Sequence, residues 1–242
     1  MTFSIPANIR PHWNYFLALE KDLEATSRYV EFSTANLDTY SIEFAHLLLS
    51  SASEVDTIAK CVCTILQPNA KADNIEKYRK IIKEGEEDED LGFNIVGKRP
   101  DIVEKLRHRL SSIKILVPRY NIQCAPWESW AEGKNPEWWQ SYNKVKHERN
   151  VHFNKATLRN ALNSIAGLLA MNYLYCRLEI TKEKPHKFQY IGKSITRYLE
   201  PPSTFMRFEQ SFYDNPFAEL GSYISSVSHD VQSLSNRIED SD

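Results

Sequence analysis

The sequence predicts a mostly helical protein: an all-α bundle that ends in a small C-terminal β-hairpin and a terminal amphipathic helix. Three observations predict this fold. The 242 residues include only 7 glycines, which turn-rich β proteins need and helix interiors disfavour. Apolar residues recur at steps of three and four, the period of an amphipathic helix. The hydrophobic and charged shares, 42% and 26%, are those of an ordinary globular chain.

Two helices are expected before Pro68. The first carries Leu19, Leu23, Thr26 and Val30 on one side. The second has a longer apolar stripe, made of Phe44, Leu48, Ser51, Val55, Ile58, Val62 and Ile65. Proline has no amide hydrogen to donate, so Pro68 should end this second helix.

Residues 71–134 are expected to elaborate a bundle over residues 1–178. Short helices are predicted over 74–83 and from Pro100 to Ile113, on either side of an acidic loop, and residues 114–134 should form an irregular connection. Asn135 and Pro136 then predict a helix start, with the Asn135 side chain as the cap. The last helix of the bundle is expected over 155–178, where Gly167 either permits a close helix crossing or is simply tolerated.

Residues 179–242 form the expected C-terminal region. The segments 195–199 (ITRYL) and 204–209 (TFMRFE) favour strands and predict a small hairpin or an extended arm. A helical seam then follows, made of Phe217, Leu220, Ile224, Val227, Val231, Leu234 and Ile238. Such a helix either docks on its own bundle or binds a protein partner.

Composition excludes several classes of function. The formal net charge of −2 provides no global attraction to nucleic acid, so any such contact needs a local basic patch. No apolar run is long enough to span a membrane, and the first residues lack the order of a signal peptide. We therefore expect a cytoplasmic protein with no membrane contact. The four cysteines are interpreted as small buried hydrophobes in a reducing compartment.

Chemistry-bearing side chains concentrate in residues 142–149 (YNKVKHER). Asn143 and His147 are four residues apart, so on a helix their side chains lie one turn above the other. Lys146 and Arg149 supply positive charge beside them. A histidine that titrates near neutral pH, together with cations for phosphate oxygens, suits a phosphodiester. A solvated helix face contains the same residue types, and that interpretation stays open. No cofactor-binding or metal-binding motif is found, so we predict no cofactor and no metal.

Two stretches together resemble the HEPN superfamily: residues 28–63 (RYVEFSTANLDTYSIEFAHLLLSSASEVDTIAKCVC) and 136–171 (PEWWQSYNKVKHERNVHFNKATLRNALNSIAGLLAM). The resemblance extends from Trp13 to Leu178. It implies a cytosolic helical bundle, often a homodimer, of the kind common in bacterial toxin–antitoxin and antiviral systems. Many members are metal-independent ribonucleases. Glu54 stands in the long helix where members often carry an acidic residue that faces the motif.

The family motif is an arginine, a polar residue that is often asparagine, a short spacer and a histidine at a helix end. Asn143 and His147 match the polar residue and the histidine, whereas Tyr142 stands at the arginine position. The resemblance implies His147 as general acid or base, Asn143 as the residue that orients the substrate, and Lys146 or Arg149 as phosphate contacts. Two functions are therefore predicted: RNA cleavage or binding, or, as the alternative, a non-catalytic helical interaction or dimerisation protein.

Overall fold

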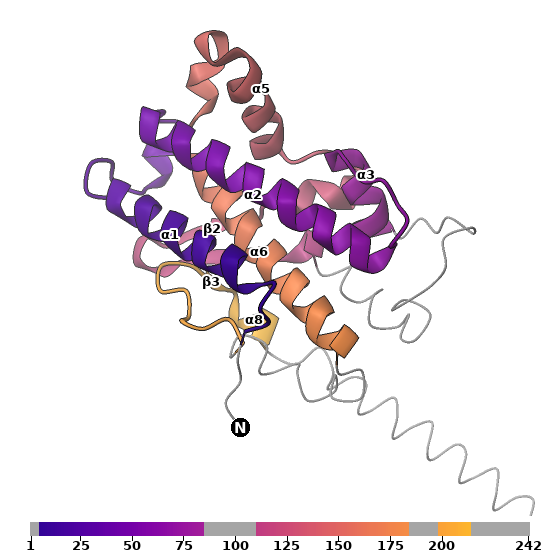
Figure 1. Ribbon diagram of the computed structural model, residues 1–242. Helices are drawn as coiled ribbons and strands as arrows, with labels where there is room; N and C mark the ends of the chain where they lie inside the picture. Colours follow the sequence, from indigo (N-terminus) through magenta and orange to yellow (C-terminus); the bar gives the residue numbers. More distant parts are fainter. Residues whose placement is uncertain (1–4, 85–109, 184–197, 214–242) are drawn as a thin grey trace, which may run out of the picture.

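The computed structural model describes residues 5–84, 110–183 and 198–213, and within them the chain is mostly helical, as predicted (Figure 1). The helices are α1 (Arg10–Thr26), α2 (Ile42–Leu66), α3 (Ile75–Arg79), α5 (Glu137–His152), α6 (Leu158–Glu183) and α8 (Gln210–Tyr213). A π-helical turn, η2 (Lys80–Glu84), follows α3, and single 3-10 turns are η1 (Thr34–Asn36), η3 (Pro118–Tyr120), η4 (Glu128–Glu132) and η5 (Phe153–Lys155). The predicted helix that begins at Pro100 and the predicted terminal helix over 216–238 lie mostly or wholly outside the described residues.

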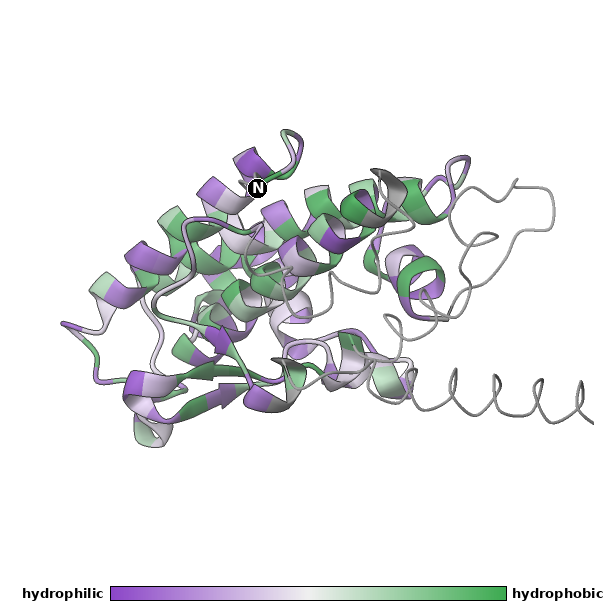
Figure 2. Ribbon diagram, turned by 90° about the horizontal axis from the view of Figure 1, so that it is seen from below, coloured by the Kyte–Doolittle hydropathy of each residue, from purple (hydrophilic) through white to green (hydrophobic). Residues whose placement is uncertain are grey.

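The centre of the bundle is the pair α2 and α6, which run side by side (Figure 1). Every residue of the predicted stripe on α2 is buried. The Ser51 hydroxyl donates to the Ser164 hydroxyl at 2.7 Å, which satisfies two polar groups inside this apolar contact. At the other end of the contact, the Leu158 amide donates to the Thr39 carbonyl at 2.9 Å, so both helices start at the same junction. In Figure 2 the hydrophobic stretches gather where the helices pack together.

Gly167 lies where a group of tryptophans packs on α6. A Cβ atom at this position would lie 3.0 Å from Cζ2 of Trp138. The Trp127 indole donates to the Gly167 carbonyl at 3.3 Å, and the Trp138 indole donates to the Pro126 carbonyl at 2.8 Å. Gly167 is therefore not simply tolerated: its missing side chain leaves room for tryptophan rings, rather than for the close helix crossing that was predicted.

The connection over 114–134 is more ordered than predicted. It contains the antiparallel strands β1 (Ile115–Val117) and β2 (Ile122–Cys124), paired with Ile115 opposite Cys124. Asn121 turns the chain between them with a φ of 51°, a left-handed conformation that asparagine tolerates well. The prediction of an irregular connection was wrong here, because each strand is too short to show an alternating pattern.

The predicted C-terminal hairpin also needs correction. The strand β3 (Arg207–Phe208) pairs with β1, with Ile115 opposite Phe208, and completes a sheet of order β2-β1-β3. Within the described residues β3 has no partner from the C-terminal region itself. Most of the other predicted strand, 195–199, lies outside the described part.

Candidate functional site

The predicted cluster lies on α5, whose burial pattern decides which of its side chains reach solvent. The buried residues are Trp138, Trp139, Ser141, Tyr142 and Val145. The predicted cap is wrong: no side chain caps this helix, and the Asn135 side-chain oxygen instead accepts a hydrogen bond from Arg79 at 3.3 Å. Asn143, Lys146 and His147 are exposed on the opposite side of the helix.

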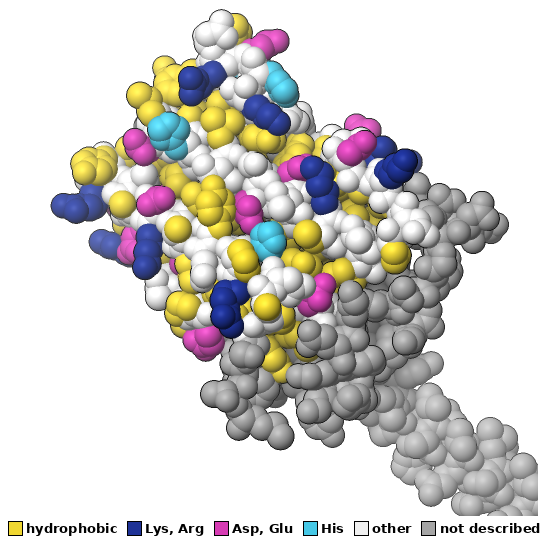
Figure 3. All heavy atoms as spheres, in the orientation of Figure 1, with side chains coloured by type: hydrophobic (Ala, Val, Ile, Leu, Met, Phe, Trp, Pro, Cys, Tyr) yellow, Lys and Arg dark blue, Asp and Glu magenta, His cyan; other side chains and the backbone are white. Residues whose placement is uncertain are grey.

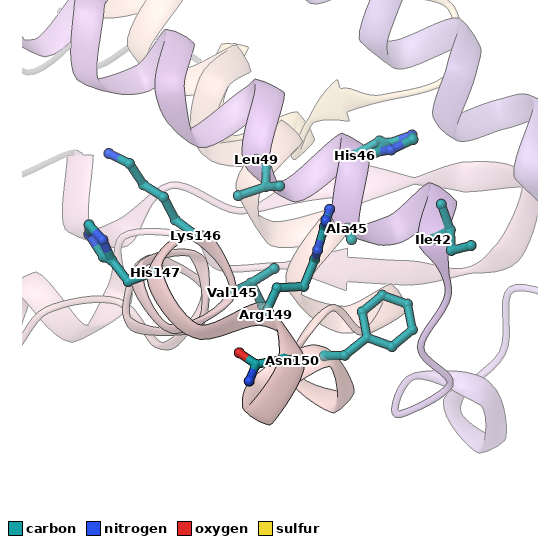
Figure 4. Close-up of a pocket in the computed structure, with 10 residues that line it drawn as sticks. Ile42, Ala45, His46, Leu49, Val145, Lys146, His147, Arg149 and Asn150 are labelled. Carbon is teal, nitrogen blue, oxygen red and sulfur yellow. The ribbon is translucent and has the colours of Figure 1, made fainter.

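The helix is kinked at Glu148, whose φ of −137° and ψ of 50° are not helical. The prediction that Arg149 lies beside Asn143 and His147 assumes an uninterrupted helix, so it does not hold across this residue. After the kink, Arg149 reaches from α5 toward Ala45 and His46 of α2 (Figure 4). The kink thus directs a guanidinium group into the space between the two helices.

A groove of about 1050 Å³ lies between the first turns of α2 and the end of α5. Its apolar lining is Ile42, Ala45, Leu49, Val145 and Phe153, and its polar lining is His46, Lys146, His147, Arg149 and Asn150. None of these lining residues is acidic. Figure 3 shows Lys, Arg and His side chains around hydrophobic ones at the top of the molecule, with acidic side chains at the edges of this region.

Three of the predicted site residues, Lys146, His147 and Arg149, line this groove, and Asn143 does not. Within the described residues no hydrogen bond joins Asn143 to His147. His46 lines the groove from α2 and was not predicted. Only the packing of α2 against α5 brings it to the site, and its local sequence, HLLL, carries no sign of that packing.

Tyr142, at the position of the family's arginine, belongs to the core. It is 6% exposed, and its ring centroid lies 5.3 Å from that of Trp139. The Lys146 ammonium lies over the Tyr142 ring, 5.4 Å from its centroid, a favourable cation–π contact. Tyr142 therefore orients Lys146 and does not itself line the groove.

Glu54 does not face the motif, which corrects the expectation drawn from the resemblance. Its carboxylate contacts Nδ1 of His12 on α1, and each of the two side chains is 17% exposed. The edge of the His12 ring meets the ring of Tyr175, with centroids 5.8 Å apart. Burial raises the pKa of Tyr175 to about 12. This second polar cluster ties α1, α2 and α6 together.

The described residues contain no group of three or more His, Cys, Asp and Glu side chains placed to hold a metal ion. Burial raises the pKa values of Cys63, Cys124 and Cys176 to about 12, so these thiols are poor nucleophiles.

Among the described helices, none has both the length and the apolar character needed to cross a membrane.

No family model, curated protein or solved structure matches this chain. The HEPN resemblance and the roles that it implies therefore stay predictions.

Proposed function

We propose that this chain binds RNA in the groove between α2 and α5. The observation that carries the proposal is that Lys146, Arg149, His46 and His147 all line one groove that no described acidic side chain lines. In the described part of the chain, no carboxylate forms an ion pair with Lys146 or Arg149, so their charge is available to phosphate oxygens. Lysine offers a compact charge, and the arginine fork matches a phosphate.

The positive side chains gather at this groove although the formal net charge of the whole chain is −2. A protein without a global positive charge can still bind a polyanion through one basic surface. The resemblance to the HEPN superfamily supports RNA as that polyanion and a homodimer as the assembly. A second copy would bring a second His147 to a shared site.

The arrangement of side chains supports binding more than cleavage. Metal-independent cleavage needs a proton-transfer group within reach of the reacting oxygen and cations on the phosphate. His147 and His46 lie on opposite sides of Leu49 in Figure 4, and Asn143 is outside the lining. If His147 also cleaves the bound RNA, the protein is a metal-independent ribonuclease, and separation of the RNA on a gel detects the products.

The test is a titration of labelled mixed-sequence RNA at several salt concentrations, followed by fluorescence anisotropy. The variant K146A/R149A removes two cations from the groove, and K144A/K155A removes two exposed lysines that lie outside its lining. Loss of two phosphate contacts should lower the slope of log affinity against log salt by about two. It should also weaken binding about tenfold or more at low salt, while the control pair stays near wild type. Equal losses in both variants, or no binding by the wild type, would refute the proposal.

The same RNA, incubated with chelator and separated on a gel, reports on cleavage. Products that form with the wild type and disappear with H147A would assign a metal-independent ribonuclease. An intact RNA that still binds would assign the non-catalytic form. Products that persist in H147A would exclude His147 as the proton-transfer group.

A second candidate function, a protein-interaction surface, is favoured by two exposed apolar side chains. Ile42 lines the groove and is 63% exposed, and Val151, next to Asn150, is 64% exposed. Apolar side chains at the edge of a groove are typical of protein contacts. If this surface joins two copies of the chain, I42S/V151S should lower the mass measured by sedimentation; an unchanged mass would contradict this second candidate function.

A further inference from the structure

Tyr40 is an exposed aromatic residue at the end of the groove. It lies two residues before the first turn of α2, and its side chain is 52% exposed. Its ring contacts the ring of Phe153, with centroids 5.6 Å apart and planes at 84°. Because Phe153 lines the groove, this contact places the Tyr40 ring directly beside the groove.

The backbone around Tyr40 is fixed from both sides. Tyr40 forms an antiparallel bridge with Thr157. The Ser41 amide donates to the Ala156 carbonyl at 3.4 Å, and the Leu158 amide donates to the Thr39 carbonyl at 2.9 Å. An exposed ring on an anchored backbone loses little conformational freedom when a flat ligand stacks on it.

We propose that Tyr40 is a stacking site for an unpaired base, so that the groove selects single-stranded RNA over duplex RNA. The inference rests on the proposed RNA binding and names its substrate class. Arg149 reaches toward the first turns of α2, the helix that Tyr40 precedes (Figure 4). A phosphate on Arg149 therefore leaves a neighbouring base within reach of Tyr40. Single-strand binders combine these two features, a cationic groove and an aromatic platform.

Duplex RNA cannot use this platform, because its bases are stacked inside the helix and its outer surface presents phosphates and 2′-hydroxyls. The cations of the groove bind phosphates of either form. The stacking contribution should therefore appear only with the single strand, whereas the ionic contribution should appear with both.

The test uses the full chain and a single-stranded RNA that carries 2-aminopurine, whose fluorescence is quenched when the base stacks on an aromatic ring. Y40F keeps an aromatic ring, and Y40L keeps an apolar cover on Phe153 without one. Y15A removes another partly exposed tyrosine, 43% exposed, from a helix that does not line the groove. Quenching by the wild type, Y40F and Y15A, and its loss in Y40L and Y40A, is the expected result.

Affinity is measured in parallel for the single strand, the matching duplex and inorganic polyphosphate. Y40A and Y40L should bind the single strand about tenfold more weakly, a loss typical of one stacked base. They should bind duplex and polyphosphate as the wild type does. Unchanged quenching in Y40L, or the same loss of affinity for all three ligands, would overturn the stacking site while RNA binding itself stands. A wild type that binds neither RNA nor polyphosphate would instead overturn the proposed function, and the stacking site with it.

Discussion

At the scale of single residues, Glu20 shows how a buried charge is stabilised. Its side chain is on α1 and is 2% exposed. It accepts hydrogen bonds from the Ser203 hydroxyl, from the Met206 amide at 2.9 Å and from the Thr204 amide at 3.4 Å. Removing a carboxylate from water is costly unless such donors surround it. Glu20 therefore anchors the segment 203–206 to α1.

Loss of this anchor should destabilise the protein strongly. We expect Glu20→Ala to lower the free energy of unfolding by about 3 kcal/mol, because it leaves buried donors unpaired. Urea denaturation measures the change. Glu24→Ala is the matched control, since Glu24 lies one turn away, is half exposed, and its side chain forms, among the described residues, only a long ion pair with Arg119, at 3.9 Å. Equal losses in the two variants would show that Glu20 is no anchor.

The sequence did not predict the role of Glu20. Its neighbours Leu19 and Leu23 mark the buried stripe, and a glutamate between them is ordinarily solvated. The residues that bind it are more than 180 positions away. His46 was missed for the same reason, since its place at the groove follows from a tertiary contact. Lys146, His147 and Arg149, in contrast, were found because they gather in one short segment.

At the scale of elements, the contact between His12 and Glu54 joins α1 to α2. Both side chains are mostly buried, and the tyrosine ring beside them limits access of water. An ion pair or hydrogen bond in such a place contributes more than one on an open helix face.

A double-mutant cycle measures this contribution. The variants His12→Ala, Glu54→Ala and the pair should give a coupling free energy of about 1 kcal/mol, because the contact is shielded from solvent. The comparison pair is Lys77 and Asp73, an exposed ion pair four residues apart, for which a much smaller coupling is expected because solvent screens both charges. A coupling for His12 and Glu54 no larger than that of the surface pair would contradict the prediction.

Long elements were predicted better than short ones. The stripe on α2 extends over several turns, so its period is unambiguous, and the helix ends at Leu66, just before Pro68. The strands β1 and β3 have three and two residues and pair across a large sequence separation, for which periodicity gives no signal. The kink at Glu148 has no proline or glycine to mark it.

At the scale of the whole molecule, buried acids that stay protonated determine the response to alkali. The pKa values of Cys63, Cys124 and Cys176 are raised from 9.0 to about 12 by burial. Between pH 9 and about pH 12, these three thiols keep their protons in the folded protein and lose them in the unfolded chain. Unfolding therefore releases protons in this range, and the stability present below pH 9 is lost as the pH rises toward 12.

The prediction is that the free energy of unfolding falls from about pH 9 upward, by at most about 1.4 kcal/mol per pH unit for each thiol. Cys124→Ala should have a shallower slope than the wild type above pH 9. Below pH 8 the two slopes should agree, which serves as the internal control for any loss of packing. Denaturation series at each pH give both slopes, and identical slopes above pH 9 would contradict the assignment to Cys124.

The contacts between α1 and the segment 201–206 also have a consequence for synthesis. The Trp13 indole donates to the Pro201 carbonyl at 2.9 Å, 188 residues later in the sequence. The Met206 amide, which donates to Glu20, lies farther along still. On the ribosome α1 therefore emerges well before the groups that complete its buried face. We expect a nascent chain that stalls before residue 201 to expose that face to chaperones and proteases, so α1 is protected from both only after residues 201–206 have been translated.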